Sequence, residues 1–489
     1  MPALGLAATV TGSSYLRNPL QGRKMSAHQN FETVIVGGTV VADSDVVRLD
    51  IGINGGRIAA LMAPGTPHVA AETLDASDCF VLPGGIDTHT HIQWPVGDGH
   101  SLDTFAEATA AAAVSGTTTI LDFVPPPSTE SHYDAALRRL HQAKDQCATD
   151  YSFRPILTSA DDITVSDVAR MAELGLRCFK IFTTYEDMRL TDGEIYRIMD
   201  AIAAADGLAG FHAENHELIA DATHRTVAAA GHGIAAFPES RPGLAEEAAI
   251  DLVSLYARDH GVPIFIFHVS GSAGLQAIRR ARKLGTAVRG ETCTHYLVFD
   301  DSVYRGANRW MYVITPPIRG DEDRNDLWNA LATGELACVG SDHCAYGRHH
   351  KYPDADDFTN MTAGAPGIDV RMPMLWSRAV SDNRLSLIDF ARVTARGPAE
   401  TFGLFPRKGI IRIGSDADII VVDPHVSWRW PNEPASWGSD YQPYGNISGQ
   451  GQVVLTLVRG QVVARDGKFV GSWQGQFLPQ DPIELASWT

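Results

Sequence analysis

The sequence predicts a (β/α)₈ barrel, an α/β fold, joined to a smaller β-sandwich built from both ends of the chain. Two observations predict the barrel: eight apolar strand candidates recur between residues 81 and 344, and helical patterns separate most of them. This alternation favours a closed parallel barrel over the open doubly wound sheet, which is the alternative. A third observation, short β runs with Gly turns near both ends, predicts the sandwich.

The elements follow in order along the chain. The strand candidates of the barrel are 81–91, 117–123, 153–158, 177–185, 210–215, 263–270, 288–297 and 336–344. The helical patterns between them are 103–114, 133–144, 166–174, 192–205, 246–259 and 272–284. The terminal β runs are 33–36, 46–53, 57–61, 410–413, 418–422, 452–457 and 461–463. We therefore expect an irregular tail at 1–30, a sandwich from 31–80 and 405–475, a barrel at 81–404 and a tail at 476–489.

Size, charge and cysteine content narrow the classes of function. A chain of 489 residues exceeds the size at which one core stops growing, so a large and a small domain are expected. The net charge of −18 would repel phosphate backbones and anionic lipids, which argues against nucleic-acid or membrane partners. Six scattered cysteines without C-x-x-C spacing predict reduced thiols and a cytoplasmic protein. No apolar stretch reaches the roughly 20 residues that span a bilayer.

Candidate metal ligands lie at the ends of the strand candidates. His89 and His91 end the first one, where a period of two directs both imidazoles to the same face. Two neutral imidazoles can bind one divalent metal ion. Later strand ends carry His212, His268 and Asp342. Active sites of such barrels lie at the carboxyl ends of the strands, so these residues predict a shared metal centre.

Lys180 lies in the apolar run Phe179-Lys180-Ile181-Phe182. An ammonium group, whose unperturbed pKa is about 10.4, is costly to bury among apolar residues. The position makes sense if the amine loses its proton and reacts with CO₂, because the resulting carbamate has two oxygens that can bridge two cations. The alternative is a lysine whose charged end extends to the mouth of the barrel.

Several motifs together resemble one enzyme family. The motifs are Pro83-Gly84-Gly85-Ile86-Asp87-Thr88-His89-Thr90-His91, Phe179-Lys180-Ile181-Phe182, His212-Ala213-Glu214-Asn215, Ser240-Arg241-Pro242, Gly290-Glu291-Thr292-Cys293, Thr315-Pro316-Pro317-Ile318-Arg319 and Gly340-Ser341-Asp342-His343-Cys344. As a set they are similar to the dihydropyrimidinase/hydantoinase branch of the cyclic amidohydrolases, over about residues 31 to 467. The resemblance implies a barrel with a β-sandwich, commonly assembled as a homotetramer.

The resemblance also implies a binuclear centre. One metal would be bound by His89, His91, Lys180 and Asp342, and the other by Lys180, His212 and His268. Lys180 would be N6-carboxylysine, a CO₂-derived carbamate that bridges the two ions. A zinc pair is expected, although sites of this type also accept Mn or Co.

The implied reaction is the opening of a cyclic amide or imide, either a dihydropyrimidine or a 5-substituted hydantoin, by metal-hydroxide attack on the carbonyl. Asp342 would be the proton shuttle, and Tyr185 would stabilise the oxyanion. Tyr185, the backbone of Thr315 and the loop at Ala363 and Gly364 would bind the substrate. Relatives usually have Ser at the position of Thr315 and Asn in the loop at Ala363 and Gly364, so this chain need not share their selectivity among rings.

Other functions remain as alternatives. Dihydroorotases place an arginine where this chain has Gln93, so an acidic ring substrate is disfavoured. An allantoinase-like or other cyclic imide hydrolase stays open. The third alternative is a non-catalytic dihydropyrimidinase-like interaction protein, but such proteins have lost metal ligands and this chain has all six.

Overall fold

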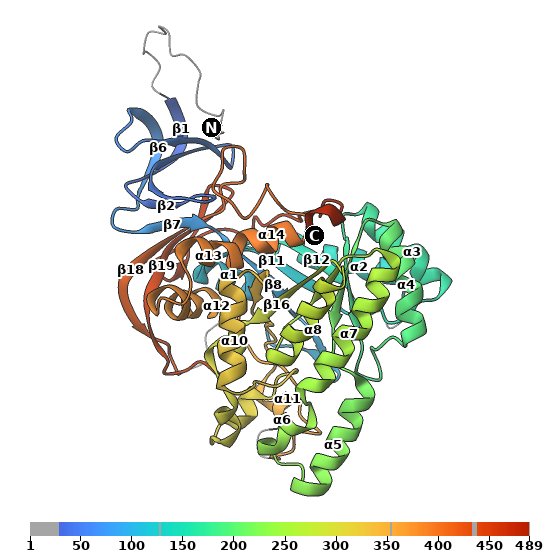
Figure 1. The fold of residues 1–489 in the computed structure, drawn as a ribbon. Helices are drawn as coiled ribbons and strands as arrows, with labels where there is room; N and C mark the ends of the chain where they lie inside the picture. The colour runs from blue at the N-terminus through green and yellow to red at the C-terminus, as the bar shows by residue number, and fades with distance from the viewer. Residues whose placement is uncertain (1–28, 127–128, 353–354, 433–437, 489) are drawn as a thin grey trace, which may run out of the picture.

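The computed structural model describes residues 29–126, 129–352, 355–432 and 438–488. Within these residues, eight parallel strands form a ring: β8 (Gly85–Thr90), β11 (Thr117–Val124), β12 (Asp150–Pro155), β13 (Cys178–Phe182), β14 (Leu208–His212), β15 (Ile264–Ile266), β16 (Val288–Cys293) and β17 (Cys338–Gly340). Figure 1 shows β8, β11, β12 and β16 in the interior of the molecule. Hydrogen-bonded pairs join β8 to β12 through β11, and β13 to β17 in sequence order. Parallel bridges between Ile156 and Lys180 and between Thr90 and His343 close the ring. The predicted barrel is confirmed.

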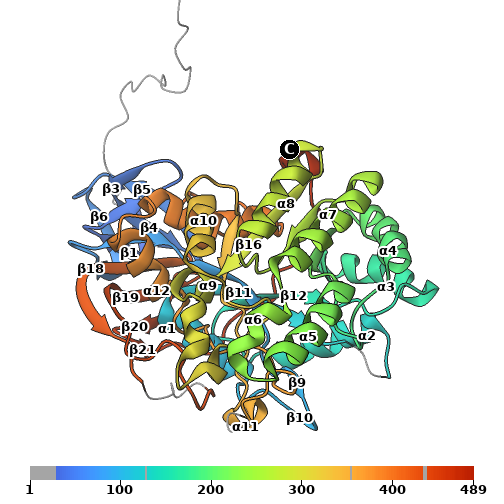
Figure 2. The same cartoon turned by 60° about the horizontal axis from the view of Figure 1, so that its bottom comes forward.

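Long helices cover the outside of the barrel (Figures 1 and 2). They are α1 (Phe105–Ser115), α2 (His132–Ala143), α3 (Asp162–Glu173), α4 (Asp192–Ala204), α5 (His216–Ala230), α7 (Gly243–His260), α8 (Ser272–Lys283) and α10 (Asp321–Ala332). The short helices are α6 (Phe237–Ser240), α9 (Thr294–Val298), α11 (Arg348–Lys351), α12 (Arg371–Leu375), α13 (Leu387–Ala391) and α14 (Gly397–Thr401). Capping boxes of Thr104 with Glu107 and of Thr191 with Glu194 begin α1 and α4. None of the helices described here is long and apolar enough to cross a membrane.

Strands from both ends of the chain form two further sheets. One has the order β5-β4-β1-β6, from β1 (Gln29–Val36), β4 (Asp50–Asn54), β5 (Arg57–Met62) and β6 (His68–Asp75). The other has the order β21-β20-β19-β18-β7-β2-β3, from β2 (Thr39–Val41), β3 (Val46–Arg48), β7 (Phe80–Pro83), β18 (Ile419–Arg429), β19 (Ser448–Val458), β20 (Gln461–Arg465) and β21 (Lys468–Phe469). Ile35 and Ile51 of the first sheet share one apolar cluster with Val40, Ile419 and Leu457 of the second. The predicted β-sandwich is therefore present.

The predicted strand 81–91 is wrong, because it is two strands in different sheets. β7 pairs with β2 and β18 in the sandwich, whereas β8 pairs with β11 in the barrel. Gly84 lies between them, and a Cβ at this position would come within 2.3 Å of the Thr118 side chain. Only glycine lets the chain pass so close to its neighbour, so Gly84 permits the change of sheet.

Four terminal predictions also need correction. The run 46–53 divides into β3 and β4, which belong to different sheets. Residues 410–413 form no strand. The strands predicted at 418–422 and 452–457 are longer, because β18 extends to Arg429 and β19 begins at Ser448. Their outer halves are only partly buried and largely polar, so an apolar run does not reveal them.

A buried charge cluster joins the sandwich to the barrel. Nζ of Lys408 lies 2.6 Å from a carboxylate oxygen of Asp150 on β12 and 2.7 Å from one of Asp418 beside β18. The Lys408 side chain is only 1% exposed. Buried charges are tolerated only when they are paired, so these contacts fix the two parts against each other.

Candidate metal centre

A cavity of about 230 Å³ lies at the carboxyl ends of the barrel strands. Every residue that the sequence assigns to the site lines it. They are His89, His91, Lys180, Tyr185, His212, His268, Thr315, Asp342, Ala363 and Gly364. Trp94, Phe182 and Met188 add an apolar wall. The fold thus brings the predicted ligands and the predicted substrate-binding residues to one place.

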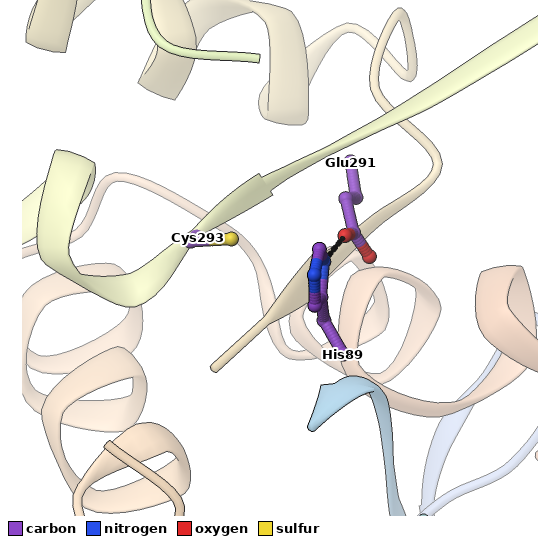
Figure 3. Close-up of side chains that lie close together, drawn as sticks. All are labelled: His89, Glu291 and Cys293. Carbon is purple, nitrogen blue, oxygen red and sulfur yellow. Dashed lines mark hydrogen bonds and ion pairs between the residues drawn. The ribbon is translucent and has the colours of Figure 1, made fainter. Parts of the chain in front are cut away.

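Glu291 of β16 orients His89 of β8 (Figure 3). Nδ1 of His89 lies 2.5 Å from Oε1 of Glu291, and both side chains are buried. Thr88 donates its hydroxyl to the other oxygen of Glu291. Burial lowers the pKa of His89 well below its usual value. Because Glu291 engages Nδ1, the Nε2 atom of the neutral ring is left to bind a metal ion.

A second carboxylate holds His212 through the opposite nitrogen. Nε2 of His212 lies 2.8 Å from Oε2 of Glu214. Arg241 donates to both oxygens of Glu214 over 3.1 and 2.6 Å. Burial raises the pKa of Glu214, but Arg241 and His212 outweigh this effect, and the pKa lies well below 4.5. Glu214 is therefore ionised, and Nδ1 of His212 remains as the potential ligand.

Buried nitrogen atoms without hydrogen bonds test whether a metal ion fits. Among the described residues, His89 Nε2, His91 Nδ1 and His268 Nδ1 have no hydrogen-bond partner. Oδ1 of Asp342 lies 3.1 Å from His89 Nε2 and 3.4 Å from His91 Nε2. Burial raises the pKa of Asp342, but the histidines bring it well below 3.8. An unpaired buried polar atom costs about 1–3 kcal/mol, so this set of imidazoles and a carboxylate fits a divalent cation.

Lys180 is buried among phenylalanine rings at the base of the cavity. Its Nζ lies 3.8 Å from the centroid of the Phe267 ring and 4.8 Å from that of Phe123. Burial lowers the pKa of Lys180 from 10.5 to about 7, although Asp342 and Glu291 oppose the shift. Near neutral pH a large share of the amine is therefore unprotonated, which is the nucleophilic form.

Tyr185 faces the cavity from the loop after β13. Its hydroxyl lies 2.5 Å from Oγ1 of Thr315. Tyr185, His268 and Asp342 have positive φ angles of 72°, 37° and 51°. Left-handed backbone at residues other than glycine costs roughly 1–3 kcal/mol and clusters at functional sites. The strained backbone thus coincides with the predicted site.

The sequence left the function of Glu291 unassigned, although it lies in one of the quoted motifs. Glu291 lies two residues before Cys293 in an apolar strand, so the two side chains point to the same face and the burial of Glu291 could be anticipated. An isolated buried acid needs a partner. The partner, His89, is on a strand that is distant in the sequence, and only the closure of the barrel reveals it.

Comparison with known proteins identifies the family. A sequence profile of the amidohydrolase family matches residues 80–463. The chain belongs to the amidohydrolase family. Among curated amidohydrolases, a D-hydantoinase of Ralstonia pickettii is 34% identical over 455 residues, which cover 91% of this chain and 98% of the relative. A D-phenylhydantoinase of Escherichia coli is 32% identical over 455 residues, which cover 92% and 98%.

Solved amidohydrolase structures share the fold. A D-hydantoinase matches with a TM-score of 0.89 and 33% identity, covering 93% of this chain and 100% of the other. A dihydropyrimidinase from Brevibacillus agri matches with a TM-score of 0.87 and 32% identity, covering 92% and 99%. The predicted branch of the amidohydrolase family is therefore confirmed.

Proposed function

We propose that this amidohydrolase opens the ring of a cyclic amide or imide, a dihydropyrimidine or a 5-substituted hydantoin, by adding water across a ring carbon–nitrogen bond. The proposal is carried by the single cavity whose wall contains four histidines together with Lys180, Asp342 and Tyr185. The relatives named D-hydantoinase and D-phenylhydantoinase, which align along nearly their whole length, support the substrate class.

The proposed cofactor is a pair of divalent metal ions, with zinc favoured and Mn or Co as substitutes. His89, His91 and Asp342 would hold one ion, His212 and His268 the other, and carboxylated Lys180 both. When bound, such a pair lowers the pKa of water and polarises a carbonyl group. The unpartnered histidine nitrogens support this assignment.

Carboxylation of Lys180 requires an unprotonated amine. The nitrogen lone pair attacks the carbon of CO₂, a C–N bond forms, and one N–H proton is released to leave an anionic carbamate. The lowered pKa of Lys180 supports this step, because the reactive amine is present near neutral pH. The carbamate would supply the negative charge and the two oxygens that a pair of cations needs.

The remaining residues would handle the proton and the substrate. Asp342 would accept a proton from the attacking water and return it to the leaving nitrogen. The Tyr185 hydroxyl would donate to the carbonyl oxygen as it becomes an oxyanion, a contribution of about 3–4 kcal/mol. The backbone of Thr315 and the loop at Ala363 and Gly364 would bind the ring amide. The Gly364 N–H already donates to Val313 O over 3.0 Å, so this loop would offer carbonyl oxygens to the ring.

A substrate panel tests the function. The protein, loaded with two equivalents of zinc in the presence of bicarbonate, is incubated with dihydrouracil, hydantoin, phenylhydantoin, succinimide and allantoin. We expect ring-opened products from the hydantoins or dihydrouracil, detected by chromatography. Preference for allantoin would favour the allantoinase-like alternative. If the metal-loaded protein forms no product from any ring, and the Asp342→Asn variant behaves in the same way, the result would favour the non-catalytic interaction protein.

We also propose a homotetramer located in the cytoplasm. The location is supported by the cysteines, because all six are free thiols and five are buried. The assembly rests on the resemblance to its family. Size-exclusion chromatography with light scattering measures the mass, and about four times the 52.8 kDa of one chain is expected. A monomer at all concentrations would contradict it.

A further inference from the structure

A second group of potential ligands shares Asp342 with the cavity but includes two residues that do not line it. Sγ of Cys293, a ring nitrogen of His295 and a carboxylate oxygen of Asp342 all lie within 4.8 Å of one another. Cys293 ends β16, His295 belongs to α9, and Asp342 follows β17. Cys293 and His295 have no part in the function proposed above.

His295 has a nitrogen that the protein leaves unsatisfied. Its side chain is 3% exposed, and Nε2 has no hydrogen-bond partner among the described residues. Buried polar groups are nearly always paired, so such an atom requires an explanation. An imidazole nitrogen of this kind is a common metal ligand.

The neighbouring cluster of His89, Glu291 and Cys293 is a weaker candidate (Figure 3). His89 and Glu291 already satisfy each other over 2.5 Å, whereas Sγ of Cys293 is turned toward the imidazole without a bond to it. The Cys293 thiol is fully buried. It remains free to combine with His295 and Asp342.

The spacing suits a small tetrahedral cation. With metal–nitrogen and metal–sulfur bonds of about 2.0 and 2.3 Å, two ligand atoms of one ion lie about 3.5 Å apart. The three ligand atoms lie within 4.8 Å of one another, so binding one ion would require them to approach by roughly 1.3 Å or less.

We propose that Cys293, His295 and Asp342 form a third, inhibitory cation site that selects thiophilic ions such as Cd²⁺ or Zn²⁺ in excess. A thiolate ligand favours these ions, whereas Mn²⁺ prefers oxygen ligands. On binding, the S–H bond breaks, a metal–sulfur bond forms and the proton leaves to solvent.

Inhibition follows from the shared carboxylate. Oδ1 of Asp342 faces His89 and His91, and the third ion would bind a carboxylate oxygen of the same residue. Asp342 could then no longer accept the proton of the attacking water. This consequence rests on the proposed function, but binding of the third ion does not.

The test uses the full-length protein in a Cys79→Ser background, because Cys79 is the one partly exposed cysteine among the described residues. Protein loaded with two equivalents of zinc is titrated with CdCl₂. The ultraviolet thiolate-to-cadmium absorption band and the bound cadmium after dialysis are recorded. The ligands assigned to the two histidine sites are nitrogen and oxygen atoms, but Cys344 lines the same cavity, so its replacement is needed to tell a band from that thiol apart from one due to Cys293.

Cys293→Ser is compared with Cys344→Ser, a matched control that is also buried and lies two residues from Asp342. We expect the band and a third equivalent of metal in the parent and in Cys344→Ser, and neither in Cys293→Ser. His295→Gln should lower the affinity for the third cadmium ion by more than the roughly 10–100-fold loss that follows when a residue merely supports a ligand. Retention of the first two ions and an unchanged circular dichroism spectrum show that the variants fold.

A band that persists in Cys293→Ser, disappears in Cys344→Ser or is absent from the parent would overturn the site. Activity is measured in parallel: excess Cd²⁺ should inhibit the parent but not Cys293→Ser, and excess Mn²⁺ should not inhibit. Equal cadmium inhibition of both proteins would overturn the inhibitory role alone. Failure of the proposed function would leave the spectroscopic result intact, so the two failures are distinguishable.

Discussion

Nδ1 of His89 lies 2.5 Å from Oε1 of Glu291, and the two side chains are 1% and 0% exposed. This contact determines which nitrogen of His89 is free, and Nε2 consequently faces Asp342 at 3.1 Å. Glu291 therefore determines which nitrogen of His89 can bind a metal ion, although Glu291 is not itself one of the predicted ligands.

Replacing Glu291 should weaken metal binding without removing a ligand. We expect zinc affinity to fall in the order wild type, Glu291→Gln, Glu291→Leu, because the amide keeps an acceptor for Nδ1 but loses the charge. Loss of such a partner typically weakens affinity about 10–100-fold. Competition with a chelator measures the change. Glu335→Gln, at a surface ion pair with Arg279, is the control, and equal affinities in all variants would refute the role.

Lys180→Ala should lose both metal ions and turnover, since the alanine cannot form a carbamate. Elemental analysis and the ring-opening assay check this. In wild type, metal uptake should increase when bicarbonate is added to metal-free protein. The exposed Lys283 of α8 provides the control Lys283→Ala, which should keep both properties. Normal metal content and turnover in Lys180→Ala would contradict the bridging role.

Tyr185→Phe should keep the metal ions and lose turnover. Removal of one oxyanion donor lowers kcat by about 10²–10³-fold. Thr315→Val removes the hydroxyl that lies 2.5 Å from the Tyr185 hydroxyl, and it should have the smaller effect because the donor itself remains. A kcat of Tyr185→Phe within threefold of wild type would exclude Tyr185 as the oxyanion donor.

Lys351 should make stability depend on pH. It is fully buried, its Nζ donates to Val313 O over 2.9 Å, and burial lowers its pKa from 10.5 to about 7. The folded-state pKa lies below the unfolded value, so the unfolded chain binds more protons between these values and the lysine's contribution to stability rises with pH.

The test compares wild type with Lys351→Met by urea unfolding. From pH 7 to pH 9 the difference in unfolding free energy should move in favour of wild type by about 2 kcal/mol. Lys283→Met at the exposed position should show no such movement. A pH-independent difference for Lys351→Met would mean that the buried amine does not titrate in this range.

Much of the site could be predicted from the sequence because its residues sit at the ends of strand patterns. The period of two in His89-Thr90-His91 and the apolar surroundings of Lys180 are local signals that survive folding. The capping threonines of α1 and α4 are local as well. Their helices were predicted to within a few residues.

The rest depends on contacts between distant segments. Nothing local to Gly84 says that the chain changes sheets there, because the reason is the Thr118 side chain beside it. The pairing of Glu291 with His89 likewise requires β8 and β16 to share one barrel interior. The outer half of β18 is only partly buried, so it has no continuous apolar run that the sequence could reveal.

The single glycine between β7 and β8 has a practical consequence for protein engineering. Strand β8, which bears His89, follows sandwich strand β7 with no linker. A barrel expressed without the sandwich would therefore lose the segment that holds β8 in place. A minimised or chimeric enzyme should therefore carry β7 and β8 with their neighbours β2, β18 and β11 as one block. Recombination points belong in the exposed turns of the sandwich instead.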